Sequence, residues 1–210
     1  PCIRREVPVI VDGRLDEWKE LPFVCDQPEL VRENADSYTG PQDCSFRIAL
    51  QHDDRYLYFA AAVTDDVFVR QLASSPVKRD WLEVLIDARP DPVRSAYIGD
   101  EKPNEFLIFK MAPSDDPAKP LVVGLNRLPF GVQVVCVRSE TGMLAEIAVP
   151  VSYLDMKQGG PWSRLRFNMA VSDFDDPERD VLAQIWWKPW WRTKESYAGS
   201  GTFAKREALR

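Results

Sequence analysis

The sequence contains a single histidine, His52, and its four cysteines show none of the short, regular spacings of zinc or redox motifs. Structural zinc sites need cysteines and histidines at such spacings, so zinc is not expected. A nucleophile–base hydrolase would have only His52 as its histidine base, and the chain lacks the Gly-x-Ser-x-Gly turn that carries such nucleophiles. We expect His52 to lie solvated in a hairpin loop at residues 51–55.

Long apolar runs, basic clusters and glycine-rich phosphate loops are also missing. The longest apolar runs, such as residues 59–63, are only a few residues long, so no segment is expected to cross a bilayer. A net charge of -6 with scattered Lys and Arg argues against a nucleic-acid partner. The first six residues carry charge and no apolar stretch, so we expect no signal peptide within this sequence.

The even number of cysteines leaves the disulfide state open. Two disulfides are possible among Cys2, Cys25, Cys44 and Cys136, and a bridge between Cys25 and Cys44 would close a loop rich in polar residues. Four reduced, partly buried thiols are equally compatible with the sequence.

Short segments of alternating apolar and polar residues, separated by Pro, Gly, Asp and Asn, dominate the chain. They predict strands at 46–50, 56–64, 81–87, 105–110, 121–125, 132–138, 143–149, 165–172, 184–187 and 202–205. Helical signal is limited to a turn or two at 15–20 and 151–156. The pattern and the length of 210 residues predict a single all-β domain over residues 1–210, a two-sheet antiparallel sandwich.

Tryptophan is the most conspicuous residue, since Trp186, Trp187, Trp190 and Trp191 fall within six residues. Adjacent residues in an extended segment point to opposite sides, so about half of these rings should face outward or lie at a rim. Pro189 disfavours a central strand there and indicates a loop that displays indoles. Flat rings stack on pyranose sugars, so the segment predicts a sugar platform; a core-edge aromatic cluster or a protein-binding patch is equally compatible.

Acidic residues offer two further possibilities. A glycosidase needs two carboxylates facing each other across a cleft, and Glu83 and Glu146, both in predicted strands, are the candidate pair; the alternative is surface charge that faces water. Calcium prefers carboxylate and carbonyl oxygens brought together by turns, and solvated turns are again the alternative. The candidate calcium ligands are Asp12, Asp16, Asp65, Asp66, Asp173, Asp175 and Asp176.

Five segments, in order, resemble family 9 carbohydrate-binding modules and the wider group of DOMON-like β-sandwiches. The first, V-I-V-D-G-R-L-D-E-W at 9–18, is similar to the family's opening V-D-G-x-x-D-x-x-W. The others are D-R-Y-L-Y-F at 54–59 leading to V-T-D-D at 63–66, D-W-L-E-V-L-I-D at 80–87, A-E-I-A-V-P at 145–150 and F-N-M-A-V-S-D at 167–173. The resemblance implies a jelly-roll-like sandwich, structural calcium in some members, and sugar held between two tryptophans beside the glutamate of a D-x-x-E strand.

Carried over by position, Glu83 matches that glutamate, and Trp190 or Trp191 falls near the later tryptophan of the sugar sandwich. The earlier tryptophan is replaced by Val77, and an arginine expected on the following strand corresponds roughly to Leu107. Trp81 shares a strand face with Glu83 and could replace the missing ring. The predicted ligand-binding residues are Trp81, Glu83, Arg166, Asn168, Trp190 and Trp191, and the predicted metal ligands are Asp12, Asp16, Asp65 and Asp173.

The leading interpretation is a non-catalytic carbohydrate-binding module, which the resemblance places in a secreted, periplasmic or cell-surface setting. A structural or protein-interaction sandwich that has lost the sugar site is the second interpretation, and a glycosidase is the third. The broad group also includes haem-binding domains, for which His52, Met111 and Met169 would be the available axial ligands.

Overall fold

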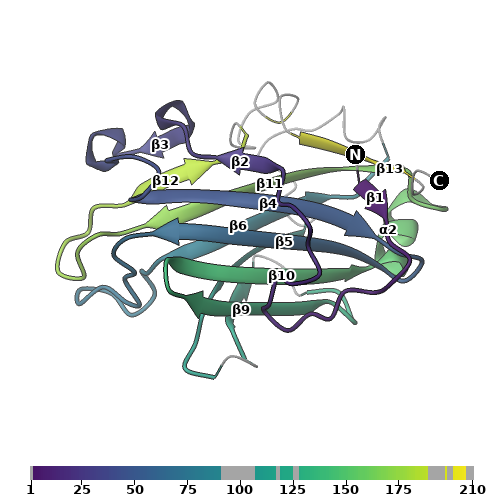
Figure 1. Ribbon diagram of the computed structural model, residues 1–210, viewed down its shortest axis with the longest axis horizontal. Helices are drawn as coiled ribbons and strands as arrows, with labels where there is room; N and C mark the ends of the chain where they lie inside the picture. The colour runs from purple at the N-terminus through teal and green to yellow at the C-terminus, as the bar shows by residue number, and fades with distance from the viewer. Residues whose placement is uncertain are drawn as a thin grey trace.

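The structure, a computed structural model, describes residues 2–90, 107–116, 119–124, 128–188, 197 and 201–206. It is dominated by strands (Figure 1), which confirms the all-β class. The strands are β1 (Cys2–Arg4), β2 (Phe23–Cys25), β3 (Val31–Glu33), β4 (Cys44–His52), β5 (Tyr56–Asp65), β6 (Trp81–Asp87), β7 (Leu107–Ala112), β8 (Leu121–Gly124), β9 (Gln133–Ser139), β10 (Gly142–Pro150), β11 (Arg164–Asp173), β12 (Ala183–Trp186) and β13 (Gly201–Arg206). The helices are α2 (Val151–Gln158) and the single 3-10 turns Pro28–Leu30 and Ala35–Ser37.

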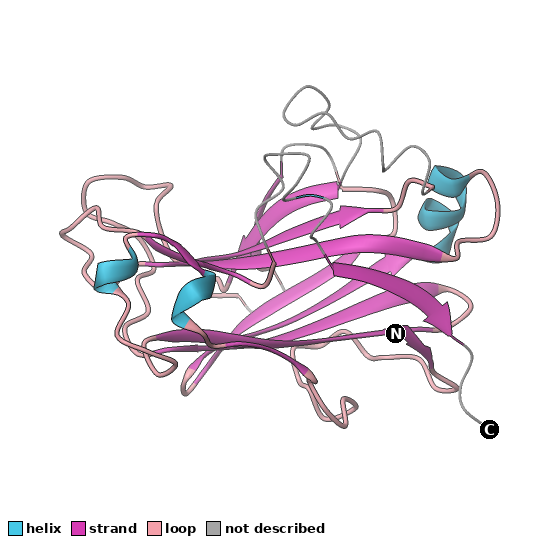
Figure 2. Ribbon diagram, turned by 90° about the horizontal axis from the view of Figure 1, so that it is seen from above, coloured by secondary structure: helices cyan, strands magenta, loops and turns pink. Residues whose placement is uncertain are grey.

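The strands lie in two layers (Figure 2). Half A contains β2, β1, β4, β5, β10 and β9, and half B contains β8, β7, β6, β11, β13, β12 and β3. The pairing is antiparallel except at β1, which runs parallel to both β13 and β4. Because β1 pairs with a strand of each half, the strands form one continuous hydrogen-bonded path rather than two separate sheets.

The alternation of residues along each strand decides which side chains enter the core. In β5 the buried row is Leu57, Phe59, Ala61 and Val63, and in β6 it is Leu82, Val84 and Ile86. Inward rings of the two halves meet in the middle, where Phe59 of β5 stacks on Phe167 of β11 at 4.7 Å between centroids. The core therefore lies between the layers, and the residues of opposite parity form the two outer faces.

Two local predictions were wrong. Residues 15–20 form no helix and make only one turn, in which Trp18 N donates to Leu15 O at 3.0 Å. His52 is not solvated, because β4 continues through it and the C-terminal strand covers it. Its ring is fully buried, with Nε2 3.1 Å from the carbonyl oxygen of Arg206 and its edge against Trp162.

All four cysteines are buried free thiols, as in the reduced alternative. Within the described ranges, no helix is both long and apolar enough to span a membrane. The predicted turn of helix at 151–156 is confirmed as α2 and ends at Gly159, whose φ of 70° suits glycine at a helix C-terminus.

Candidate functional site

The outer face of half B gathers most of the residues predicted to bind sugar. On β6, Trp81 and Glu83 point away from the core because Leu82 and Val84 point into it. On the neighbouring β11, Arg166 and Asn168 share this face and lie opposite Asp87 and Leu85, respectively. Trp190 and Trp191, the other two predicted contacts, lie outside the described residues.

A cleft of about 470 Å³ opens at the Trp81 end of this face. One wall comes from the loop after β5 and the other from the loop after β11, while the strands supply the floor. The residues that line this Trp81 cleft are Glu33, Asn34, Val77, Lys78, Arg79, Trp81, Lys110, Ser172, Phe174, Asp180 and Leu182. Its size suits a small ligand, and its lining mixes one aromatic ring with many hydrogen-bonding groups.

Trp81 contributes one edge of its ring to the cleft, since the side chain is 9% exposed. Its indole N–H donates to the carbonyl oxygen of Val77 at 3.3 Å, and the Arg79 guanidinium lies 5.3 Å from the ring centroid. Val77 itself is 71% exposed and presents no ring. Within the described part of the cleft, the ligand-facing surface is therefore more polar than an aromatic sandwich.

On β7, the strand after β6, the cation that faces Glu83 is Lys110. Lys110 lies directly opposite Glu83 in the β6–β7 register, and its Nζ is 3.4 Å from the Glu83 carboxylate. Leu107 points into the core and is 1% exposed. Lys110 also lines the cleft, so the Glu83–Lys110 pair borders the space that a ligand would fill.

The side chains of Asn168 and Arg166 form hydrogen bonds with backbone groups of the C-terminal part of the chain. The Asn168 carboxamide is buried; its Oδ1 accepts from Lys188 N at 3.1 Å and its Nδ2 donates to Lys188 O at 3.2 Å. Arg166 donates to Tyr197 O at 3.1 Å and stacks on the Tyr197 ring. These contacts hold both residues that flank the segment carrying Trp190 and Trp191.

Trp186 and Trp187 point to opposite sides, as adjacent strand residues should, but neither displays its ring to solvent. Trp187 packs in the core against Phe23 and Phe203. Trp186 lies on the outer face of half B under Tyr197 and is 0% exposed. About half of the four clustered tryptophans were expected to face solvent, but neither Trp186 nor Trp187 does so.

Five aspartates converge at the end of the core next to the Trp81 cleft. Asp65 and Asp173 end the inward-facing rows of β5 and β11, and Asp80 precedes the inward row of β6. The five aspartates form two groups that share Asp173, and within each group one carboxylate oxygen of every member lies within 4.8 Å of the others. The groups are Asp65, Asp80 and Asp173, and Asp43, Asp173 and Asp175. We call the five residues the acidic end cluster.

Two of the five carboxylates in the acidic end cluster, those of Asp65 and Asp173, have no hydrogen-bond partner among the described residues. Both oxygens of each are buried. Burial and the neighbouring carboxylates raise the pKa of Asp80 and of Asp173 to about 9. Burial likewise raises the pKa of Asp65 to about 6, although Arg138 opposes that rise. Buried carboxylates without partners are costly unless a cation neutralises them.

These donors fit a hard cation such as calcium, which binds oxygen ligands. The nearby Cys44 would not act as a metal ligand, because burial raises the pKa of its thiol well above the ordinary value and a thiol must lose its proton to bind a metal. Of the predicted metal ligands, Asp65 and Asp173 belong to the cluster. Asp12 and Asp16 lie in neither group, and the carboxylate of Asp12 accepts from Arg14 N at 2.8 Å instead.

Glu146, the second carboxylate of the glycosidase alternative, is a buried structural acceptor. It receives hydrogen bonds from Asp12 N at 3.0 Å, Gly13 N at 2.9 Å and the Trp18 indole at 2.8 Å. It therefore binds three positions of the V-D-G-x-x-D-x-x-W segment. Glu146 faces outward from half A and Glu83 outward from half B, so the two carboxylates cannot flank one glycosidic bond.

The haem alternative finds no ligand set among the described residues. His52 is buried against Trp162, and Met111 and Met169 both lie in the main hydrophobic core. All three side chains are fully buried, which leaves none of them open to a haem beside it.

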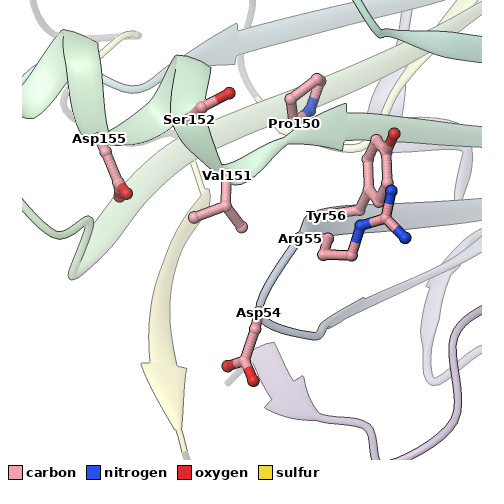
Figure 3. Close-up of a pocket in the computed structure, with 7 residues that line it drawn as sticks. All are labelled: Asp54, Arg55, Tyr56, Pro150, Val151, Ser152 and Asp155. Carbon is pink, nitrogen blue, oxygen red and sulfur yellow. The ribbon is translucent and has the colours of Figure 1, made fainter.

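Two other hollows differ in character from the Trp81 cleft. One of about 380 Å³ lies where the β4–β5 hairpin meets the start of α2 (Figure 3), and its lining includes Asp54, Arg55 and Tyr56 on the hairpin side and Val151 and Asp155 on the helix side. The Arg55 guanidinium covers the Tyr56 ring at 5.6 Å. The other, of about 960 Å³, lies between β1 and β2 over Ala49 and Leu50 of β4. Neither contains a residue predicted to bind sugar.

Comparison with known proteins gives a family and a fold. The sequence profile of the family described as "Carbohydrate family 9 binding domain-like" matches residues 11–198. A family 9 module from Caldicellulosiruptor kristjanssonii solved in complex with glucose is 17% identical, with a TM-score of 0.68 over 99% of this chain and 96% of that chain. A structure of such a module from the same organism with cellotriose is 18% identical, with a TM-score of 0.65 over 99% of this chain and 93% of that one. A search of curated proteins gave no match.

Proposed function

Because the chain belongs to the carbohydrate family 9 binding domain-like family, we propose that it is a non-catalytic module that binds saccharide in the Trp81 cleft. The observation that carries the proposal is the position of this cleft, whose lining includes Trp81, Lys110 and Ser172 and which lies beside Glu83, the partner of Lys110. The related modules solved with glucose and with cellotriose support neutral glucose-based sugars as the first ligands to test.

The chemistry of the cleft suits a sugar ring held mainly by hydrogen bonds. Within the lining, Lys110 and Asn34 offer donors, Asp180 offers acceptors, and the Ser172 hydroxyl can do both, while Glu83 lies beside the cleft as the partner of Lys110. The Trp81 edge supplies one apolar wall for C–H groups. A second ring would have to come from outside the described residues, and Trp190 and Trp191 are the candidates. Nothing in this chemistry calls for a catalytic step.

Calorimetric titration with glucose, cellotriose and a wider saccharide panel tests the proposal. We expect binding to weaken about tenfold or more in Lys110→Gln, since a charged hydrogen-bond donor and the partner of Glu83 are lost together. Lys157→Gln on α2 is the matched control and should bind as the parent does. A folded protein with no affinity for any saccharide would overturn the proposal.

We further propose calcium as a structural cofactor, held by the acidic end cluster. The support is the set of buried carboxylate oxygens without partners. A calcium ion there would neutralise the end of the core between β5, β6 and β11, and it would supply no reactive group.

One observation favours a second candidate, a protein-interaction sandwich without a sugar site. The described tryptophans Trp18, Trp81, Trp162, Trp186 and Trp187 are all at most 9% exposed. Under this alternative, acrylamide would quench the tryptophan fluorescence poorly and no saccharide would change that quenching. Protection of one tryptophan population by saccharide would exclude it.

A further inference from the structure

The acidic end cluster lies directly behind the Trp81 cleft. Asp80 immediately precedes Trp81, and Asp173 lies between Ser172 and Phe174. Successive strand residues point to opposite faces, so the two aspartates point inward while Trp81 and Ser172 face the cleft. A change at the cluster therefore acts on residues that are covalently adjacent to the cleft lining.

Asp80 also ties together the two loops that form the cleft walls. The loop at 66–80 follows β5, and the loop at 174–182 follows β11. The Asp80 Oδ1 accepts from Phe174 N at 2.9 Å, and its Oδ2 accepts from Val69 N. One carboxylate thus accepts from a backbone N–H group of each loop.

Further contacts join the same two loops beyond Asp80. Ala73 N donates to Pro177 O at 2.7 Å, and Lys78 pairs with Asp180. Phe174 packs in a small hydrophobic cluster made of Val69, Leu72, Phe174 and Leu182. Several of the joined residues line the cleft, so the relative position of the loops sets its shape.

The carboxyl groups packed at the base of these loops disfavour this arrangement unless protons or a cation neutralise them. When the carboxyl groups of Asp65, Asp80 and Asp173 are ionised, they repel one another within a buried space. A divalent cation among them would replace that repulsion with attraction to all three strands. Repulsion would act most directly on Asp80, through which both loops are bonded.

We propose that a cation in the acidic end cluster holds the two loops in the arrangement that forms the Trp81 cleft, so that cation and saccharide bind with positive coupling. The inference rests on the proposed function, since it requires saccharide to bind in that cleft. Asp80 is then a positioning residue, because it acts on the ligand only through the loops. Thermodynamic linkage requires each ligand to strengthen the other by the same factor.

The experiment measures both directions of the coupling on the intact chain. Cellotriose is titrated by calorimetry in saturating calcium chloride and again in EDTA, and Tb³⁺ is titrated by its luminescence with and without saturating cellotriose. We expect removal of the cation to weaken cellotriose binding at least about fivefold, and cellotriose to strengthen Tb³⁺ binding by the same factor.

A pair of variants separates positioning from a merely structural effect. Asp65→Asn removes a carboxylate of the cluster that lies outside both loops and outside the cleft lining. It should weaken Tb³⁺ binding and, at low calcium, cellotriose binding, and high calcium should restore the latter. Asp54→Asn, at the opposite end of the β4–β5 hairpin, is the control and should change neither affinity.

The outcomes are distinct. Equal cellotriose affinity with and without cation, or failure of Tb³⁺ to bind, overturns the coupling and leaves the proposed saccharide site standing. Saccharide binding that fails even in saturating calcium overturns the proposed function, and the coupling falls with it. Loss of cellotriose binding in Asp65→Asn that high calcium does not restore would assign that residue a structural role instead.

Discussion

Among single residues, Glu146 has the clearest structural role, because its fully buried carboxylate accepts hydrogen bonds from three donors. Burial raises its pKa, while the hydrogen bonds from Trp18, Gly13 and Asp12 lower it. Gly13 has a φ of 84°, and a Cβ there would lie 2.8 Å from Val137, so the bonded turn also requires glycine. The opening motif of the chain is therefore a structural device centred on Glu146.

Replacement of this carboxylate tests that account. Glu146→Ala leaves two backbone N–H groups and the Trp18 indole buried without an acceptor, and we expect the free energy of unfolding to fall by about 3–5 kcal/mol. Urea denaturation measures the change, and the exposed Glu140→Ala serves as control. A loss below about 1 kcal/mol would mean that water or other groups satisfy these donors.

At the scale of secondary-structure elements, β11 connects the parts of the candidate site. Its inward row carries Phe167 into the core and ends at Asp173 in the acidic end cluster. Its outward row carries Asn168, which binds Lys188, and Ser172, which lines the Trp81 cleft. One strand thus supplies a core ring, an aspartate of the acidic end cluster and part of the cleft lining by alternation alone.

The Asn168 carboxamide provides a test at this scale. Asn168→Ala removes its bonds to the backbone of Lys188 and to Met169 N, so we expect a loss of about 2–4 kcal/mol in unfolding free energy. Thr202→Ala on the adjacent β13 is an exposed control. If urea denaturation shows equal stability for Asn168→Ala and the control, the carboxamide does not anchor the chain after β12.

How far the sequence predicts these elements depends on whether the relevant signal is local. Alternation located most strands, because each pattern lies within a few consecutive residues. The Glu83–Lys110 pairing could not be predicted, since nothing local fixes the register of β6 and β7 across residues 88–106. The inward direction of Asp65 and Asp173 could be predicted, because each ends the inward-facing row of its strand. Asp43 joins the cluster only through the tertiary fold, which the sequence pattern does not show.

Across the whole molecule, we expect the acidic end cluster to make the free energy of unfolding depend on pH and, if it binds a cation, on cation concentration. In cation-free protein the pKa of Asp80 and of Asp173 is about 9, against an ordinary value of 3.8, so the folded state binds more protons between these values. The free energy of unfolding should then fall as pH rises from about 4 to about 9. Asp65, with a folded-state pKa of about 6, adds to the lower part of this range.

Calcium should reverse the trend, because it binds the ionised carboxylates. In EDTA we expect stability to fall by several kcal/mol, as an order of magnitude, between pH 5 and pH 9, and calcium to stabilise most at the upper end. Urea denaturation at both pH values checks this, and Asp173→Asn should flatten the profile in EDTA and reduce the calcium effect. Stability that is unchanged or rises with pH in EDTA would contradict a buried, cation-free acidic cluster.

Binding of saccharide in the Trp81 cleft can be located by mapping amide and indole chemical shifts during titration with cellotriose. Perturbations should concentrate at the Trp81 indole, Lys110, Ser172 and the loops at 66–80 and 174–182. Saturable perturbations confined to the hollow between β1 and β2, or to the hollow beside α2, would contradict it.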